Sequence, residues 1–228
     1  MKKSLILPFI SLICAIFLFA CSGHNGQNSL TRQKLKGDVK TMEIRSYYAT
    51  EKYGEVQTGD LSHRMTFKYD QSGNQLEMNF YLSNDELVSK NIFTYDQNGN
   101  ETEVTTFIHG KKTKAILKID ENGNPTETYS YDSTGALTQR TTSLYDDKGN
   151  LTEWDKYGPK GDLISKNTFK YDDLGNQIEL NVYDSRGEFL EKQIDKYDKV
   201  DKKGNWIKQI IFRYDKPFMI TERKIEYY

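Results

Sequence analysis

Apolar and polar residues alternate along much of the chain beyond residue 60. In the segment 61–69, apolar side chains stand at Leu61, Met65, Phe67 and Tyr69, and polar side chains fill the even positions. A period of two over this length predicts β-strands with one buried face and one face in water. The same alternation recurs at Leu76, Met78 and Phe80, and at Trp206, Ile210, Phe212 and Tyr214.

A turn motif separates these segments. Asp-x-x-Gly-Asn occurs six times, at steps of 26, 24, 26, 26 and 29 residues. The Asp side chain can accept a hydrogen bond from the backbone two residues on, and Gly adopts the left-handed conformation that follows a type I turn in hairpins. We therefore predict that each copy forms a hairpin tip with a structural role. The motif residues are Asp70, Gly73 and Asn74; Asp96, Gly99 and Asn100; Asp120, Gly123 and Asn124; Asp146, Gly149 and Asn150; Asp172, Gly175 and Asn176; and Asp201, Gly204 and Asn205.

Weaker turns at 132–135, 158–161 and 184–187 divide the repeat, so a unit of about 26 residues contains two turns. We predict thirteen or fourteen strands, with a capping strand near residue 40 and a closing strand at 218–228. Hydrophobic residues make up only 36% of the chain, which favours a thin core. The predicted fold class is all-β: tandem antiparallel β-hairpin repeats that form an extended, twisted, solenoid-like meander sheet, preceded by a signal-peptide helix.

The first twenty residues differ from the rest. Lys2 and Lys3 precede an apolar run from Leu5 to Phe19, and Ala20-Cys21 follows. This order is typical of a secretory signal, and the cysteine resembles that of the bacterial lipobox, which is acylated, for instance with palmitate. The alternatives are a plain secretory signal and a retained helix, although a membrane-spanning helix needs ~20 apolar residues. We predict a signal peptide at 1–20, the lipidated Cys21 and a flexible tether at 21–34, and a repeat domain at 35–228.

Charge and cysteine content exclude several classes of protein. The net charge is −1, and removal of the signal leaves 30 basic and 33 acidic residues. This balance lacks the basic stripe of a nucleic-acid-binding protein. Cys14 and Cys21 are the two cysteines, so the processed chain would have no free thiol and no cysteine-based metal site. We expect no nucleic-acid partner and no cofactor.

Eight Tyr-Asp pairs accompany the turns, and Tyr-Asp-x-x-Gly-Asn begins at Tyr69, Tyr95, Tyr145 and Tyr171. This pattern resembles the YD repeat of RHS-type proteins from bacterial surfaces and secreted toxins. The alternation of shorter and longer segments is also similar to MORN-like and YwqK-type hairpin repeats. The run 203–208 resembles segments of small YD-repeat lipoproteins of Bacteroidota. The resemblance implies a β-hairpin repeat surface for binding or scaffolding, and it carries no catalytic residue.

Few side chains suggest chemistry. His24, His63 and His109 lack the spacing of a metal or catalytic site. The oxygen-rich turns look like the start of a calcium loop but lack its bidentate Glu, so a turn role is favoured over weak calcium binding. No hydrolase, zinc-protease or phosphate-loop motif occurs, and we predict neither a metal site nor enzyme activity. Possible ligand-contact aromatics are Trp154, Tyr157, Tyr183 and Trp206, with a place in an aromatic core as the alternative.

The predicted function is a lipid-anchored protein whose repeat surface binds or scaffolds a partner protein. A carbohydrate-binding surface protein and an immunity-like protein that neutralises a toxin are the alternatives. The predicted location is the cell envelope, at the outer membrane and facing the periplasm. Ser22 follows Cys21, without an Asp that would indicate retention in the inner membrane and without the acidic cluster expected for surface export, although the sequence leaves exposure on the cell surface as an alternative.

Overall fold

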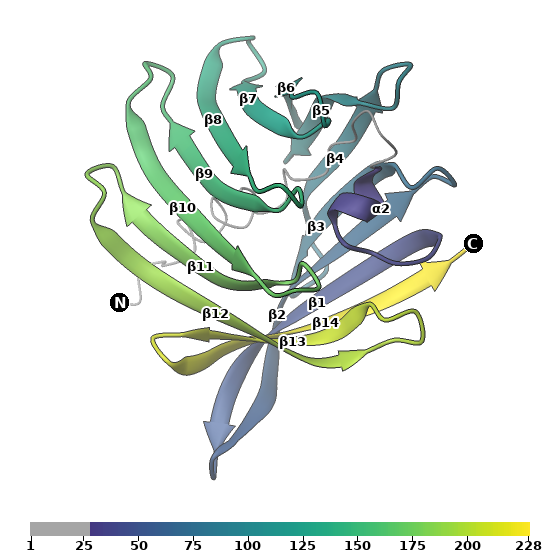
Figure 1. Ribbon diagram of the computed structural model, residues 1–228, viewed down its shortest axis with the longest axis vertical. Helices are drawn as coiled ribbons and strands as arrows, with labels where there is room; N and C mark the ends of the chain where they lie inside the picture. The colour runs from purple at the N-terminus through teal and green to yellow at the C-terminus, as the bar shows by residue number, and fades with distance from the viewer. Residues whose placement is uncertain (1–27) are drawn as a thin grey trace.

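The computed structural model describes residues 28–228, and this part of the chain is almost entirely β-structure (Figure 1). Within it, one short helix, α2, spans Ser29–Arg32, and fourteen strands follow. No helix between residues 28 and 228 is long and apolar enough to cross a membrane. The strands are β1 (Val39–Lys52), β2 (Glu55–Tyr69), β3 (Gln75–Leu82), β4 (Leu87–Tyr95), β5 (Glu101–Ile108), β6 (Lys111–Ile119), β7 (Pro125–Tyr131), β8 (Leu137–Tyr145), β9 (Leu151–Tyr157), β10 (Leu163–Tyr171), β11 (Gln177–Asp184), β12 (Phe189–Val200), β13 (Trp206–Arg213) and β14 (Lys216–Tyr227).

The fourteen strands close into one antiparallel barrel. Each strand pairs with its neighbours in sequence, and the ring is completed because β1 pairs with both β2 and β14. Met42 of β1 thus lies between Phe67 of β2 and Ile225 of β14. The chain is all-β and antiparallel, but the predicted open, extended, solenoid-like meander is wrong. The strands predicted to cap and to close the sheet are the two that join.

The low apolar content did not require an open sheet, because much of the barrel interior is polar. Asn91, Thr141, Asn167 and Gln193 are all buried. Thr106 Oγ1 donates to Asn91 Oδ1 at 2.6 Å across β4 and β5. Buried polar groups are tolerated when they find such partners, so the enclosed interior needs fewer apolar residues than a sandwich core does.

The six Asp-x-x-Gly-Asn segments form hairpin turns at one end of the barrel, which we call the capped end. In the turn at 146–150, the Asp146 backbone N–H donates to the Asn150 carbonyl, and the Gly149 N–H donates to the Asp146 carbonyl. Asp146 Oδ1 also accepts the backbone N–H groups of Lys148 and Asn150, at 2.9 and 2.8 Å. The side-chain amide of Asn150 donates to Asp146 Oδ2 at 2.9 Å. Gly149 has a φ of 74°, which favours glycine.

The tyrosine that precedes many of these turns joins neighbouring hairpins. Tyr95 Oη donates to the Gln75 carbonyl at 2.7 Å, and Tyr197 Oη donates to the Gln177 carbonyl at 2.7 Å. In each case the acceptor lies 20 residues earlier, at the start of the strand after the previous motif turn. The Tyr-Asp pair therefore links one repeat to the next by a side-chain hydrogen bond.

Residues 28–37, which we call the cap, lie across the capped end. Leu30 N–H donates to the Gly73 carbonyl at 3.1 Å, and Arg32 Nη1 donates to the Gly123 carbonyl at 3.4 Å. The Lys36 N–H donates to Asn205 Oδ1 at 2.7 Å. Residues 28–34 were expected to belong to a flexible tether, but here they fold against the turns because their backbone and side chains find acceptors there. The predicted signal peptide, Cys14, Cys21 and His24 lie outside the described residues.

A ladder of ion pairs covers part of the outer face of the barrel. It is built on a glutamate seven residues after the motif aspartate in five successive units. Glu77 pairs with Lys68 and Lys90 at 3.4 and 2.7 Å, and Glu179 pairs with Lys170 and Lys192 at 2.9 Å each. Such exposed pairs contribute little individually, about 0–1 kcal/mol. The ladder glutamates are Glu77, Glu103, Glu127, Glu153 and Glu179.

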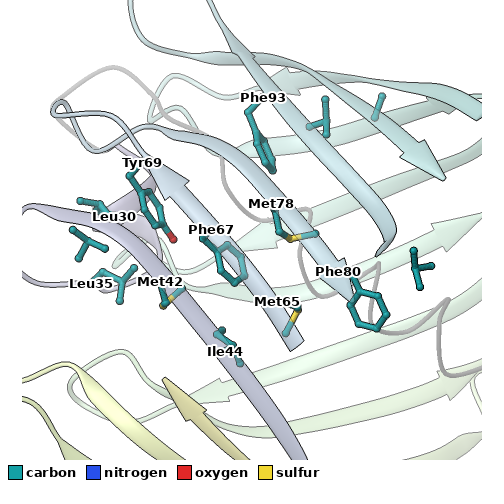
Figure 2. Packing of buried hydrophobic residues seen from close by; sticks show 14 of the residues in the cluster. Leu30, Leu35, Met42, Ile44, Met65, Phe67, Tyr69, Met78, Phe80 and Phe93 are labelled. Atoms are coloured by element: carbon teal, nitrogen blue, oxygen red, sulfur yellow. The ribbon is translucent and has the colours of Figure 1, made fainter. Parts of the chain in front are cut away.

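Apolar packing is concentrated on one side of the barrel. Met42, Met65, Phe67 and Phe80 belong to a buried cluster that also includes Leu30 of the cap (Figure 2). A smaller cluster on β9–β11 contains Leu151, Trp154, Phe169 and Leu180. The interior therefore has an apolar side on β1–β6 and a more polar side beyond it.

We expect Asp146→Ala to lower the free energy of unfolding by about 1–2 kcal/mol, because three hydrogen bonds to the carboxylate are lost. The measurement is urea denaturation followed by circular dichroism. Asp147→Ala is the matched control, since Asp147 is exposed in the same turn, and its effect should stay within about 0.5 kcal/mol. Equal effects of the two substitutions would contradict a structural role for the motif aspartate.

Candidate functional site

A cavity of about 330 Å³ lies inside the barrel. It is lined by side chains from β1 and β2 on one side, from β11–β14 on the other, and from the cap. Its volume is near the lower end of the roughly 300–1,000 Å³ that small-molecule sites occupy. The cavity is therefore large enough for a small ligand.

One wall of the cavity is apolar. Met42 and Ile44 of β1 and Met65 and Phe67 of β2 line it, and all four are buried. Figure 2 shows their side chains on two adjacent strands within the larger apolar cluster. Methionine side chains are flexible and adapt to irregular apolar ligands.

The opposite wall contains a buried carboxyl group. Asp195 on β12 is 4% exposed, and Gln193 Nε2 and Gln177 Nε2 each donate to one of its oxygens at 2.9 Å. Burial raises the pKa of Asp195 to about 6, although the two amide hydrogen bonds and the Arg213 guanidinium favour the ionised form. Asp195 thus changes its protonation state in mildly acidic solution.

Arg213 lies near Asp195 and has an acidic partner of its own. Its Nε is 2.8 Å from Glu191 Oε1, and its guanidinium carbon is 4.1 Å from the centre of the Phe218 ring. Burial lowers the pKa of Arg213, while Glu191 raises it. Its charge is therefore compensated within the barrel wall.

Arg223 on β14 lacks such a partner. Its guanidinium carbon lies 3.3 Å from the centre of the Trp206 ring, and both residues line the cavity. Among residues 28–228, no acidic side chain forms a salt bridge with Arg223, and its buried Nε has no hydrogen-bond acceptor. Burial lowers the pKa of Arg223 to about 10, so the side chain still carries its charge at neutral pH.

His63 is the histidine of the cavity wall. Its ring stacks on Phe80 with a centroid distance of 5.2 Å, and Nδ1 lies 3.2 Å from Ser62 Oγ. Burial lowers the pKa of His63 to about 4. The ring is therefore neutral at pH 7 and adds no charge there. His109 lies at a hairpin tip with a φ of 46° and does not join the cavity.

The charges that line the cavity are unequal. Basic side chains outnumber the single acidic one, Asp195, and come from the cap as well as the barrel. Perturbed groups gathered in a cavity indicate a functional site. Both oxygens of Asp195 are held by amides, and within residues 28–228 no group of three or more His, Cys, Asp or Glu side chains could hold a metal ion. The basic residues of the lining are Arg32, Lys34, Arg213 and Arg223.

The four aromatics considered as ligand contacts do not come together. Trp154 is 3% exposed and belongs to the smaller apolar cluster. Tyr157 carries the Arg140 guanidinium 4.5 Å from its ring centre, and Tyr183 packs edge-on against Phe189. Trp206 alone among the four lines the cavity.

Sequence reasoning missed Asp195, Arg213 and Arg223. It placed Phe212 and Ile210 on the inward face of β13, whereas Arg213 and Ile211 line the cavity. Register shifts between β12 and β13 move the strand by a residue relative to a regular ladder, which reverses the faces. The signal available in the sequence was Arg213 itself, a charged residue between the aromatic residues Phe212 and Tyr214.

Comparisons with known proteins assign no family. No family model matches the chain, and no curated protein matches it. Solved structures match the chain at low identity, three of them as follows. A porin-like protein from Bacteroides uniformis has a TM-score of 0.48 at 13% identity, over 84% of this chain and 98% of that one. A DUF1329 family protein from Desulfovibrio piger has a TM-score of 0.36 at 10% identity, over 83% and 86% of the two chains. A LolA superfamily protein from Nitrosomonas europaea has a TM-score of 0.36 at 8% identity, over 87% and 91%.

The resemblance to YD-repeat, RHS-type, MORN-like and YwqK-type proteins is wrong. No family model supports it, and the hairpins close into one barrel instead of continuing as an open repeat sheet. The six turn motifs are real features of the chain, but turn chemistry of this kind suits any antiparallel hairpin.

We expect Asp195→Asn to change the pH dependence of stability. A raised pKa in the folded state makes the wild type lose stability as pH rises from the unfolded value of 3.8 through about 6. The free energy of unfolding of the variant, minus that of the wild type, should therefore increase by roughly 2–3 kcal/mol between pH 3.5 and pH 8. Urea titrations at several pH values measure this difference, in which the contribution of His63 cancels. A difference that stays constant with pH would show that Asp195 titrates normally.

Proposed function

We propose that this protein is a non-catalytic binding protein of the bacterial cell envelope that holds a small amphipathic ligand inside its barrel. The observation that carries the proposal is the cavity of about 330 Å³, which has an apolar wall on β1 and β2 and a cationic wall on β13 and β14. Ligand sites are concave and mostly apolar, with a few polar groups that orient the ligand. The cavity combines these properties.

The charged outer face of the barrel favours a role in holding a ligand inside the molecule over a role as a membrane pore. A barrel that lipid surrounds has an apolar band on its outside. Here the ladder glutamates place charged pairs along β2–β12, for example Glu77 with Lys90 and Glu179 with Lys192. The cap also crosses one end of the barrel, where Leu30 and Lys36 bond to the turns.

The membrane anchor remains part of the proposal. Lipidation of Cys21 would hold the protein at the outer membrane, facing the periplasm. Asn28 follows Cys21 by seven positions, and seven residue steps span at most about 25 Å. The capped end would then stay close to the membrane surface.

A neutral amphiphile tests the site. We expect 1-octanol to bind the Cys21→Ala protein in isothermal titration calorimetry, and Ile211→Trp to weaken binding at least tenfold because the larger side chain enters the cavity. Phe212→Trp is the matched control, since Phe212 is the next residue on β13 and carries Lys196 above its ring instead of lining the cavity. Binding of neither 1-octanol nor octanoate, or equal binding of octanol by both tryptophan variants, would show that the cavity is not the ligand site.

A second candidate function, binding of a partner protein, is favoured by the hairpin of β1 and β2. These strands have 14 and 15 residues, and their hairpin extends beyond the rest of the barrel (Figure 1). Tyr53 at its tip is fully exposed and Tyr48 is half-exposed. Exposed aromatic residues on a projecting hairpin are typical of protein contacts.

Cross-linking in native membranes tests the partner. We expect one protein to be recovered with the wild type and lost with Tyr53→Ala, while Tyr214→Ala, at another exposed hairpin tip, leaves recovery unchanged. Recovery of the same proteins with both variants would remove the hairpin from consideration.

A further inference from the structure

Arg223 occupies an inward position in the wall of the cavity. The strand register places Arg223 of β14 directly opposite Ile44 of β1, which in turn lies opposite Met65 of β2. All three side chains line the cavity. The guanidinium group and the apolar wall are therefore cross-strand neighbours on one continuous surface.

The charge of Arg223 is not balanced within the described part of the chain. Tyr69 and Tyr197 lie close enough to influence its pKa, but their hydroxyl groups donate to Gln33 Oε1 and to the Gln177 carbonyl. The Trp206 ring face offers a cation–π contact at 3.3 Å and no full negative charge. An enclosed cation without an anionic partner is unfavourable, so the site is complete only with an added anion.

The other charged groups of the cavity do not supply that anion. Glu191 pairs with Arg213 at 2.8 Å, and Asp195 is held by two glutamine amides. Of the two cations that the cap contributes to the lining, Arg32 donates to the Gly123 carbonyl and Lys34 Nζ donates to the Lys148 carbonyl, both in motif turns. Gln75 Nε2, which also lines the cavity, is a buried donor with no acceptor among residues 28–228.

We propose that the ligand of this cavity is a medium-chain carboxylate, with its carboxylate on the Arg223 guanidinium above Trp206 and its chain along Ile44, Met65 and Phe67. This inference rests on the proposed function, because it names the chemical class of the ligand at the same site. A guanidinium can bind a carboxylate through two parallel hydrogen bonds. One unpaired guanidinium matches the single charge of a carboxylate, whereas a phosphate monoester carries about two charges at pH 7.

The size of the cavity fits a short chain. The cavity volume of about 330 Å³ equals that of about eleven water molecules, at about 30 Å³ for each molecule in the liquid. Octanoate and 1-octanol, with about nine or ten non-hydrogen atoms, fill most of this space and differ only in the headgroup. Comparison of the two isolates the contribution of the negative charge.

The test measures octanoate and 1-octanol binding to the Cys21→Ala protein at pH 7.5, by calorimetry and by tryptophan fluorescence, to which Trp206 in the cavity and Trp154 outside it both contribute. We expect octanoate to bind at least tenfold more tightly than octanol. Arg223→Met should remove this preference, so that octanoate binds no more tightly than octanol. Lys224→Met is the matched control because Lys224 is the next residue, is exposed and lies outside the cavity lining, and it should behave as the wild type.

Different results overturn different parts of the argument. If octanol binds and octanoate binds no more tightly to the wild type, the cavity is a lipophilic site without a carboxylate subsite, and this inference fails. If neither compound binds, the proposed function fails as well. Should Arg223→Met fail to fold, the wild-type comparison still decides, and Arg223→Lys should retain a preference for octanoate that is weaker than that of the wild type.

Discussion

The pairing of β1 with β14 is the interaction on which the rest of the molecule depends. Nine residue pairs join the two ends of the sheet, from Val39 with Tyr227 to Tyr48 with Met219. Without them the sheet would have two free edges, which invite pairing with other chains. With them, the inward side chains face an enclosed space. Closure thus creates the interior, and the cavity exists because a fourteen-stranded ring is wider than the side chains that fill it.

The interior is divided between two kinds of surface, and this division defines what the barrel can hold. Residues of β1–β6 pack as an apolar cluster, whereas Gln193, Asp195, Gln209 and Arg223 occupy the side formed by β12–β14. The cavity lies at the boundary between them. A ligand in this place meets apolar contacts on one side and charge on the other, as an amphipathic molecule requires. The charged side chains of the ladder lie on the outer face and do not enter this interior.

Local features of the fold could be predicted from the sequence, and distant ones could not. The spacing of Asp-x-x-Gly-Asn indicated the turns, and alternation at Met65, Phe67 and Tyr69 indicated the buried face of β2. Closure depends on contact between residues near 44 and residues near 223, and nothing local marks that pair. A sheet of the same hairpins can remain open or close, depending on strand twist and stagger.

The candidate site was less accessible to sequence reasoning for a related reason. Arg223 lines the cavity and Lys224 is exposed, but both stand in a run of three consecutive charged residues, Glu222-Arg223-Lys224. A period of two identifies two faces without saying which is enclosed. The usual rule that apolar residues face inward is incomplete on β13, where Gln209 and Arg213 line the cavity beside Trp206 and Ile211. The cap was equally hidden, because its polar composition suits a tether as well as a lid.

The cap has a mechanical consequence. Residues 28–37 are both the end plate of the barrel and the continuation of the chain that leads back to Cys21. If that cysteine is anchored, any load between membrane and protein passes first through the bonds of Leu30 with Gly73 and of Lys36 with Asn205. These hydrogen bonds lie between the anchor and the barrel and therefore carry the load before the strands of the barrel wall do. Tension on the anchor would therefore loosen the end plate before it distorts the barrel, and the end plate borders the cavity.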